Sequence, residues 1–235
     1  MSRLQQNMPL TSPYSCLHKP VTCETVKICL LNARSLRLHF QDVQADPLTQ
    51  STDVFFTEAH IYINQTELYS LPTYQHIIKQ QDRNNSHGLA CYIKRNMQCR
   101  EIPVPDVTSL ETLGVELIIP NSTLTFIVIY KPPKVTMADL LRDLQIILKA
   151  IDNVQKTIIL GDFNGDALAA ESQPLKYLMQ QFTFKFTHGT THNHGSCLDH
   201  VYLPKDIQNM YNCYTFLPTY FSDHFYVHLQ LGISA

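Results

Sequence analysis

The sequence has no tryptophan, no paired cysteines, no excess of positive charge and no long hydrophobic run. Its 18 Lys and Arg residues face 20 Asp and Glu residues, which gives a formal net charge of −2. Proteins that hold nucleic acid through a positive field over the whole domain are usually basic, so this class is excluded. No apolar run reaches the roughly 18 residues that a transmembrane helix needs, and the first ten residues lack the order of a secretory signal. We therefore expect an intracellular protein without a membrane partner.

The seven cysteines are odd in number and show no paired short spacing, so a disulfide framework is not expected. Hydrophobic residues make up 44% of the chain, and 12 Tyr and 11 Phe supply aromatic area that a disordered tail would lack. A chain of 235 residues with this composition is typical of one globular domain.

The sequence pattern changes near residue 25. Residues 1–25 carry three prolines among polar residues and show no sustained period, which indicates a mobile arm or a linker. Residues 26–235 form the expected domain. Ten β-rich runs follow one another there, at 26–31, 53–57, 74–79, 89–93, 113–119, 124–130, 157–160, 198–203, 213–217 and 225–231.

Helical period is seen in fewer places. The clearest stretch puts Leu140, Leu141, Leu144, Ile147, Leu148 and Ile151 on one face, and a second covers about 172–182. A weaker helix is expected between Leu36 and Leu48. Many strands separated by a few helices indicate an α/β domain in which two stacked sheets are covered by helices.

The most informative segment runs from Ile158 to Asp166. An apolar strand stops at Gly161 and is followed by Asp162 and Asn164, whose side chains emerge on the same side of the chain. Functional sites are often built at such strand ends. An Asx turn that merely closes the strand is the structural alternative, because Asp and Asn favour turns.

Four other strand boundaries carry similar groups. Asn32 and Glu58 each follow an apolar run, and Asp223-His224 precedes the last strand. Asp199 lies inside an apolar run, where a carboxylate is costly unless it has a partner, and His224 is a natural candidate. Each residue alone is open to a structural interpretation, but their recurrence at the same place in the strand-loop unit favours a shared site.

The chemistry of this set points to a hard cation. Glu58, Asp162, Asp199 and Asp223 together would repel a phosphodiester, so such a substrate could approach only if cations neutralised the carboxylates. Oxygen ligands of this kind suit Mg²⁺, and Mn²⁺ could substitute.

Six motifs in this order resemble the endonuclease/exonuclease/phosphatase superfamily over about residues 26–231. They are Leu31-Asn32, Thr57-Glu58, Tyr130 before Pro132-Pro133, Gly161-Asp162-Phe163-Asn164, Leu198-Asp199 and Ser222-Asp223-His224. Finer features, Asn32-Ala33-Arg34-Ser35-Leu36 and Glu58-Ala59-His60, resemble the endonuclease domains of non-LTR retrotransposons, including some fused to Helitron-type transposon proteins.

The resemblance implies a four-layer α/β-sandwich, with two mainly antiparallel sheets flanked by helices, that hydrolyses phosphodiesters with one or two Mg²⁺ ions. Glu58 would be the principal metal ligand, with Asn32 nearby, and Asp223 would support the metal or the histidine. Asp162 and Asn164 would position water and phosphate, and Tyr130 would contact that phosphate. Asp199 would orient His224, which would stabilise charge in the transition state.

The narrower resemblance implies an endonuclease that nicks double-stranded DNA and leaves a 3′-hydroxyl, within a transposable-element protein. A reverse transcriptase or helicase would be a covalent neighbour, and the nucleus the expected location. The basic residues between Lys79 and Arg100, with Lys131 and Lys134, would contact DNA, although a solvated rim is an equally simple interpretation. Arg34, His60, Arg95 and Lys131 are the expected DNA contacts.

The chain also departs from its relatives. Members that cut at abasic sites use aromatic residues, including a Trp shortly before the Leu-Asp motif, where this chain has Ser196-Cys197. We therefore expect cleavage of undamaged duplex, unless Phe184, Phe186 or Tyr214 replaces that pocket. His200 stands where relatives often have Tyr, which indicates altered packing or an added polar contact.

Three alternatives stay open. His188, His192, His194, His200 and Cys197 lie close in sequence and could form a zinc site, although a polar loop that meets DNA explains them too. The superfamily also includes enzymes that act on inositol phosphates, sphingomyelin and nucleotides. Finally, the chain could be a degenerate nucleic-acid-binding module that has lost catalysis.

Overall fold

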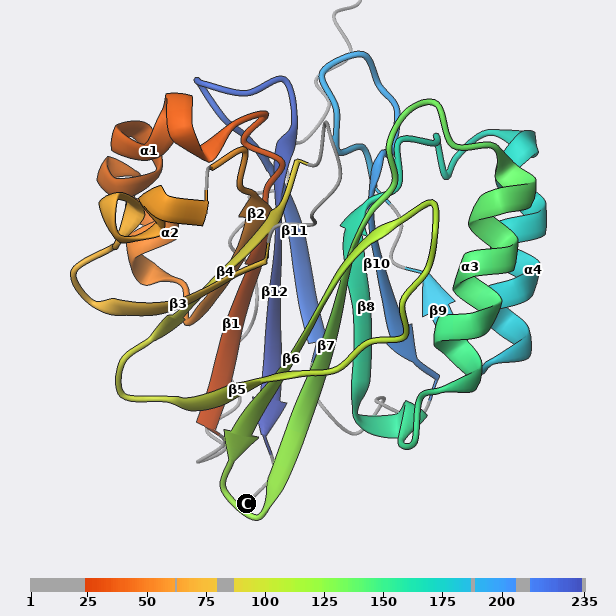
Figure 1. The fold of residues 1–235 in the computed structure, drawn as a ribbon, viewed down its shortest axis with the longest axis horizontal. Coiled ribbons are helices and arrows are strands. Elements are labelled where there is room, and N and C mark those ends of the chain that lie inside the picture. The colour runs from red at the N-terminus through yellow and green to blue at the C-terminus, as the bar shows by residue number, and fades with distance from the viewer. Residues whose placement is uncertain (1–23, 62, 80–86, 187–188, 206–211, 234–235) are drawn as a thin grey trace, which may run out of the picture.

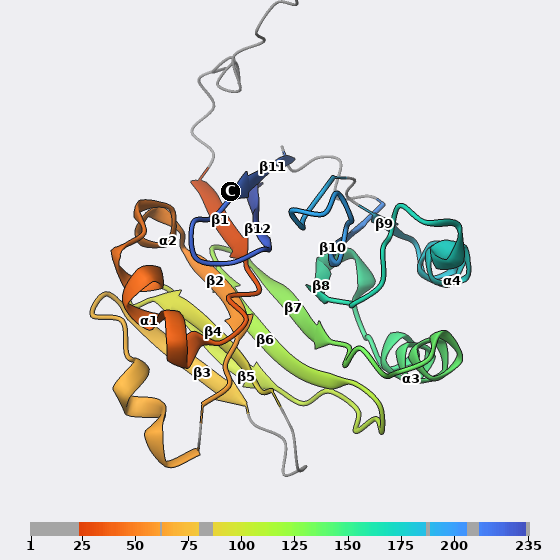
Figure 2. The same ribbon diagram turned by 90° about the horizontal axis from the view of Figure 1, so that it is seen from above.

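The structure is a computed structural model that describes residues 24–61, 63–79, 87–186, 189–205 and 212–233. Two six-stranded sheets lie face to face in the middle of the molecule (Figure 1). Helices α1 (Leu36–Ala45) and α2 (Pro47–Ser51) cover the outer face of one sheet, and α3 (Met137–Lys149) and α4 (Gln173–Gln181) cover the other (Figures 1 and 2). The expected four-layer α/β-sandwich is confirmed.

Both sheets follow the same pairing pattern, with one parallel pair at the centre and antiparallel pairs on either side. The first sheet has the order β11-β12-β1-β2-β4-β3, from β1 (Glu24–Leu30), β2 (Val54–Glu58), β3 (Tyr74–Lys79), β4 (Leu89–Lys94), β11 (Asn212–Pro218) and β12 (Phe225–Ile233). The second has the order β5-β6-β7-β8-β10-β9, from β5 (Gln98–Ile102), β6 (Glu111–Ile119), β7 (Ser122–Tyr130), β8 (Thr157–Asp162), β9 (Phe184–Phe186) and β10 (Asp199–Pro204).

All ten predicted strands are found, and two more were missed. The missed strands, β5 and β9, lie at the two edges of the second sheet. β5 is mostly polar and partly exposed, and β9 has only three residues, so neither carries the hydrophobic pattern that identifies a strand in the sequence.

The weak helix expected over 36–48 is two helices in the structure. Asp46 ends α1 and caps α2, where its side chain accepts a hydrogen bond from the Leu48 N–H. The break has a simple cause, because the residue before a proline is pushed out of the helical region and Pro47 follows Asp46. α3 begins after the Thr136 cap and ends at Lys149, so Ile151 lies beyond the helix. Short 3-10 helices occupy Ile63–Tyr69, Val154–Lys156 and Ala170–Ser172.

Three hydrophobic clusters hold the four layers together. One fills the space between the sheets, one lies between the second sheet and α3 with α4, and one lies between the first sheet and α1 with α2. The central strands are therefore buried on both faces, which explains runs such as Ile158-Ile159-Leu160. Among the described residues, no helix is both long and apolar enough to cross a membrane. The predicted arm over residues 1–25 falls almost wholly outside the described residues.

The pairing pattern brings the polar strand ends together. β1, β2, β7 and β8 end at the upper edge of the sandwich in Figure 1, and the antiparallel strands β4, β10 and β12 begin there. In the second sheet Tyr130 and Asp199 are both in register with Asp162. In the first sheet Glu58 is in register with Leu89, the first residue of β4.

Gly161 permits the close approach of β7 and β8 beside the site. Its φ is 150°, and a Cβ at this position would lie 1.7 Å from the carbonyl oxygen of Ile129. No other residue fits without displacing one of the two central strands. The position of Asp162, the next residue, depends on this contact.

We predict that Gly161→Ala lowers the free energy of unfolding by about 3 kcal/mol or more, because both backbone strain and overpacking oppose the added methyl group. Urea denaturation followed by circular dichroism measures the change. Gly165→Ala is a matched control, since its Cβ would meet its nearest atom at 3.5 Å, and its effect should stay within about 1 kcal/mol. Equal stability of the two variants would contradict the role given to Gly161.

Candidate active site

Asn32 joins two buried carboxylates that come from different sheets. Its Nδ2 donates to Oε1 of Glu58 at the end of β2 and, at 2.7 Å, to Oδ2 of Asp162 at the end of β8. All three side chains are buried. A small pocket at this end of the sandwich is lined by Asn32, Glu58, Tyr130, Asp162 and Asp199, among others. The structure thus brings Asn32 into contact with Asp162, which lies 130 positions later in the chain.

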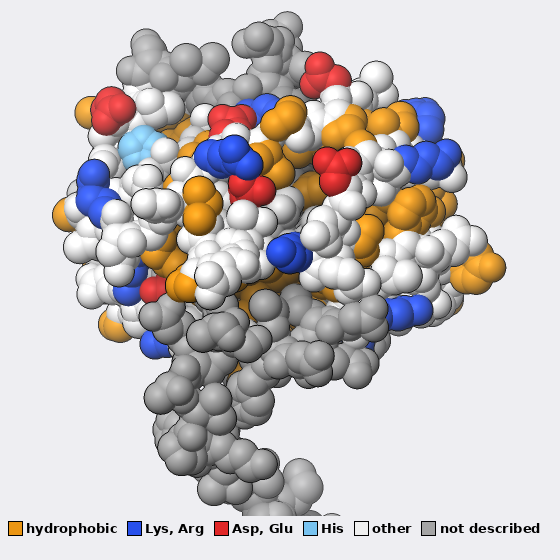
Figure 3. Space-filling view, turned by 90° about the horizontal axis from the view of Figure 1, so that it is seen from below, with side chains coloured by type: hydrophobic (Ala, Val, Ile, Leu, Met, Phe, Trp, Pro, Cys, Tyr) orange, Lys and Arg blue, Asp and Glu red, His pale blue; other side chains and the backbone are white. Residues whose placement is uncertain are grey.

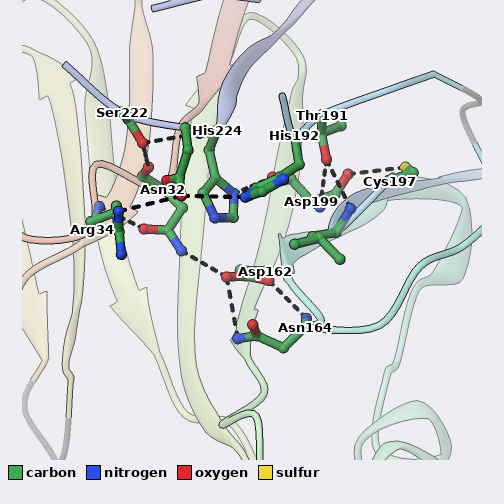
Figure 4. Close-up of polar contacts among 12 residues, drawn as sticks. Asn32, Arg34, Asp162, Asn164, Thr191, His192, Cys197, Asp199, Ser222 and His224 are labelled. Carbon is green, nitrogen blue, oxygen red and sulfur yellow. Dashed lines mark hydrogen bonds and ion pairs between the residues drawn. The ribbon is translucent and has the colours of Figure 1, made fainter. Parts of the chain in front are cut away.

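Asn164 holds Asp162 from the other side, as Figure 4 shows. Its backbone N–H donates to Asp162 Oδ1 at 2.7 Å, and its Nδ2 reaches Asp162 Oδ2 at 3.3 Å and the Lys131 carbonyl at 2.9 Å. The left-handed φ of 41° at Asn164 allows this return, and Asn accepts such a conformation at low cost. Burial, followed by the charges of Asp199 and Glu58, raises the pKa of Asp162 well above its usual value.

Asp199 and His224 form a buried pair. Asp199 Oδ2 lies 2.7 Å from His224 Nδ1, and Thr191 Oγ1 accepts hydrogen bonds from the N–H groups of Leu198 and Asp199, both at 2.9 Å. Burial lowers the pKa of His224, but the hydrogen bond and charge of Asp199 outweigh it and raise that pKa to about 9. His224 is therefore protonated near neutrality, and its charge faces the acidic pocket.

Tyr130 and Lys131 follow one another at the end of β7. Burial and then the charges of Glu58 and Asp162 raise the pKa of Tyr130, so its hydroxyl stays protonated and can donate. Lys131 is buried, and its Nζ lies 3.4 Å from the Pro132 carbonyl and 3.5 Å from the Asn164 carbonyl. Burial lowers the pKa of Lys131.

Asp223 lies at the rim rather than with Glu58. Its Oδ2 is 3.3 Å from Arg34 Nη1 and 3.3 Å from His192 Nε2. Burial raises the pKa of Asp223, but a backbone hydrogen bond and the charge of Arg34 outweigh it and lower that pKa. Arg34 itself is exposed and left-handed (φ 58°), and its N–H donates to Asn32 Oδ1 at 2.7 Å. The backbone N–H of Arg34 thus helps to fix the orientation of the Asn32 amide.

His87 and Glu111 belong to the site, and the sequence analysis missed both. His87 Nδ1 lies 3.4 Å from Glu58 Oε2, and His60 Nε2 lies 3.0 Å from the same oxygen. Burial raises the pKa of Glu58, but the hydrogen bonds of His60 and His87 outweigh it and lower that pKa. In the sequence, only the position of His87 just before the apolar start of β4 could indicate a functional residue.

Arg95 is not brought to the site. It follows β4 at the end away from Leu89 and Glu58, and its Nε donates to the Pro72 carbonyl at 3.2 Å. On the end of the molecule seen in Figure 3, basic side chains lie interspersed with acidic and hydrophobic ones. Of the other basic residues, Arg83 lies outside the described residues. Lys94 forms an ion pair in which its Nζ lies 3.6 Å from Asp53 Oδ1.

The five residues of the alternative zinc site do not converge in the part of the chain that the structure describes. His200 is buried, stacks on Phe163 with ring centroids 4.6 Å apart, and contacts the Tyr202 hydroxyl at 3.0 Å. His192 lies instead with Asp223 and His224, and His188 is outside the described residues. Burial lowers the pKa of His200 to about 4. The His200 ring therefore packs in the core and also makes polar contacts there.

Where abasic-site enzymes have a Trp, this chain has Ser196 and the buried Cys197, so no aromatic ring is exposed there. Phe184 and Phe186 are buried in the core beneath α4, whereas Tyr214 on β11 is 40% exposed. Of the three aromatic residues considered as replacements, only Tyr214 has an exposed ring.

The donors of the pocket fit a hard divalent cation. Glu58, Asp162 and Asp199 offer carboxylate oxygen atoms, and Asp199 Oδ1 is buried without a hydrogen-bond partner among the described residues. Asn32 turns its Nδ2 toward this cluster and its Oδ1 toward the backbone N–H of Arg34. Carboxylate and amide oxygens are the ligands that Mg²⁺, Ca²⁺ and Mn²⁺ prefer. A cation there would balance negative charge that is costly to bury.

Comparison with known proteins places this geometry in a family. Residues 31–224 match the Endonuclease/Exonuclease/phosphatase family. Among solved structures, the endonuclease domain of TRAS1, a telomere-specific non-LTR retrotransposon, is similar with a TM-score of 0.70 and 11% identity, over 88% of this chain and 98% of that one. TDP2 from D. rerio complexed with single-strand DNA product has a TM-score of 0.60 and 12% identity, over 88% and 99%.

Other solved structures share the fold at similar distance. The human Nocturnin catalytic domain has a TM-score of 0.61 and 14% identity, over 89% of this chain and 94% of that one. No curated protein matches the sequence significantly. Because the family match covers most of the chain, this chain belongs to the endonuclease/exonuclease/phosphatase family of phosphodiester hydrolases.

Proposed function

We propose that the chain is a Mg²⁺-dependent endonuclease that nicks double-stranded DNA and leaves a 3′-hydroxyl, as one domain of a transposable-element protein. One observation carries the proposal: buried carboxylates line a pocket at one end of the sandwich, and a histidine that is bonded to one of them lies beside it. Similarity to the TRAS1 endonuclease domain supports the transposon context, in which a reverse transcriptase or helicase would be the covalent neighbour and the nucleus the place of action.

Glu58 would hold the Mg²⁺ ion, for which Mn²⁺ could substitute, with Asn32 beside it. Asn32 would offer its oxygen to the ion after a turn of its amide, because Nδ2 faces Glu58 and Asp162 in this structure. Bound there, the ion would polarise a phosphoryl oxygen and offset the negative charge of the cluster. Asp223 would act less directly than expected, because it contacts the Arg34 guanidinium and His192 and not Glu58.

Asp199 is proposed to position His224. Its carboxylate accepts the Nδ1–H hydrogen bond, which fixes the ring orientation and keeps the imidazole protonated. The other ring nitrogen, Nε2, is then a charged donor for a phosphate oxygen. A charge that is fixed in place stabilises the transition state more than the ground state, because phosphate oxygens gain negative charge as the nucleophile attacks.

Asp162 and Asn164 would place the attacking water and the scissile phosphate, and Tyr130 would donate to that phosphate. The raised pKa of Asp162 makes it a better proton acceptor for a water molecule than an exposed carboxylate. Both side chains are held by hydrogen bonds before substrate arrives, which lowers the entropic cost of aligning the water.

Arg34, His60 and Lys131 are the proposed DNA contacts. Arg34 is exposed and adjacent to Asn32, so a phosphate beside the scissile bond would lie within its reach. Undamaged duplex is the proposed substrate, because no aromatic ring is exposed at Cys197 to hold a flipped-out sugar. Local groove shape and flexibility would then select the nicking position.

We predict that the protein nicks undamaged supercoiled plasmid only with Mg²⁺ or Mn²⁺, and that a polymerase extends the nick. Glu58→Gln should lower the rate by about 10²-fold or more, while its melting temperature shows that the fold remains. Glu116→Gln is the control, because Glu116 pairs with Arg100 on the second sheet, outside the pocket lining. Equal nicking in excess chelator would contradict the proposal, and cleavage of only a non-DNA phosphodiester would favour another substrate class.

We predict that Asp199→Asn costs roughly 10² or more in rate, as expected for a lost orienting partner. The double variant with His224→Ala should be scarcely slower than His224→Ala alone, because the two residues act as a unit. Asp143→Asn is a matched buried control on α3 that should lose stability and keep the rate. Additive losses in the double variant would show that Asp199 acts independently of His224.

We predict that Arg34→Gln reduces the dependence of DNA affinity on salt by about 0.9 in the log-log slope, the value for one phosphate contact. Binding is measured with Ca²⁺ in place of Mg²⁺ at several salt concentrations. Arg95→Gln should leave the slope unchanged, because Arg95 lies at the other end of β4. A flatter slope for Arg95→Gln alone would place the duplex on the opposite end of the sandwich.

A further inference from the structure

Three potential metal ligands meet at the second carboxylate oxygen of Glu58. His60 Nε2 lies 3.0 Å and His87 Nδ1 lies 3.4 Å from Glu58 Oε2, and the two nitrogens are 2.7 Å apart. The first oxygen, Oε1, contacts Asn32 instead. Glu58 therefore has an oxygen-lined side and a nitrogen-lined side.

The two histidines are held in place by contacts other than those to Glu58. The segments that carry them are linked by backbone hydrogen bonds, from Ala59 N–H to the Gly88 carbonyl at 3.0 Å and from His60 N–H to the His87 carbonyl at 2.6 Å. Glu111 accepts the N–H groups of His87 at 2.9 Å and Gly88 at 2.7 Å. The His87 ring also stacks on Tyr130, with centroids 4.7 Å apart.

His60 has a left-handed backbone with a φ of 48°. This conformation is uncommon for a residue with a side chain and costs of order 1 kcal/mol. Here it accompanies the return of the imidazole toward Glu58, two residues earlier. The surrounding hydrogen bonds keep the strained residue in a geometry that converges with His87.

The chemistry of this group differs from that of the oxygen-lined pocket. Two imidazole nitrogens and one carboxylate oxygen are a ligand set for borderline cations such as Zn²⁺, Co²⁺ and Mn²⁺, whereas Mg²⁺ prefers oxygen alone. Bonds of about 2.0–2.1 Å in a tetrahedral site imply ligand atoms roughly 3.3 Å apart. The observed separations of 2.7, 3.0 and 3.4 Å lie around this value, so a small shift of the rings suffices.

We propose that Glu58, His60 and His87 form a binding site for one borderline transition-metal dication, next to the magnesium site of the proposed function and sharing Glu58 with it. Both rings are about one-third exposed or less, so solvent molecules can complete the coordination. Because both sites use the Glu58 carboxylate, an ion bound by the histidines would affect Mg²⁺ binding, and Mg²⁺ would affect the binding of that ion.

The test is Co²⁺ titration of chelator-treated protein, followed by visible absorption and by calorimetry, without DNA and without turnover. One equivalent should bind and give the absorption of a site with nitrogen ligands, and Zn²⁺ should displace it. Loss of outer-sphere partners alone costs 10–100-fold in metal affinity, so His87→Ala and His60→Asn should each weaken binding by about 10²-fold or more. Asn is chosen at position 60 because it accepts a positive φ.

His192→Ala is the matched control, because His192 lies in the neighbouring group with Asp223 and His224 and should keep full affinity. Unchanged affinity in His87→Ala, or loss of affinity in His192→Ala, would overturn the proposal. Displacement of Co²⁺ by equimolar Mg²⁺ would also overturn it, since that result indicates oxygen ligands. A protein that nicks plasmid but does not bind Co²⁺ would contradict only the transition-metal site. A protein that binds Co²⁺ but does not nick plasmid would contradict only the proposed function.

Discussion

The Asn32 amide is the contact on which the site depends, because it is shared by carboxylates that belong to different sheets. Glu58 ends a strand of the first sheet, Asp162 ends a strand of the second, and both are buried. Two neighbouring carboxylates of like charge are costly to bury unless hydrogen-bond donors or cations lie between them. The Asn32 amide supplies one N–H donor to each carboxylate. The backbone N–H of Arg34 holds this amide by donating to Asn32 Oδ1.

The rest of the fold supplies the free energy that keeps such a cluster buried. Three apolar clusters fasten four layers, so the strand ends cannot separate to hydrate the acids without exposing hydrophobic surface. The close approach at Gly161 then sets where Asp162 emerges, next to Tyr130 and opposite Asp199. Packing therefore sets the positions of the strand ends, and electrostatics limits which side chains can be buried there.

The sequence predicted the fold and most of the pocket because strand ends and polar residues coincide. Buried strands appear as apolar runs, and parallel pairs end on the same edge, so the residue after each run was placed near the others. His87 could not be found this way, because it precedes a strand and its link to Glu58 runs through a pairing of β2 with β4. Arg95 is predicted as a DNA contact from the basic stretch between Lys79 and Arg100, but the length of β4 separates it from Leu89 and Glu58. Long-range register is a property of packing, and a local pattern does not contain it.

The two oxygens of Glu58 show how one carboxylate can serve two environments. Oε1 faces the Asn32 amide beside a second acid, where a hard cation would further relieve the charge, while Oε2 faces two imidazoles that can bind a metal. The histidines already lower the pKa of Glu58, so the carboxylate is ionised before any cation arrives. An ionised ligand held by donors on one side binds a cation on the other with little reorganisation. His60 and His87, which contact Oε2, therefore influence how Oε1 binds a cation, whichever ion lies on either side of Glu58.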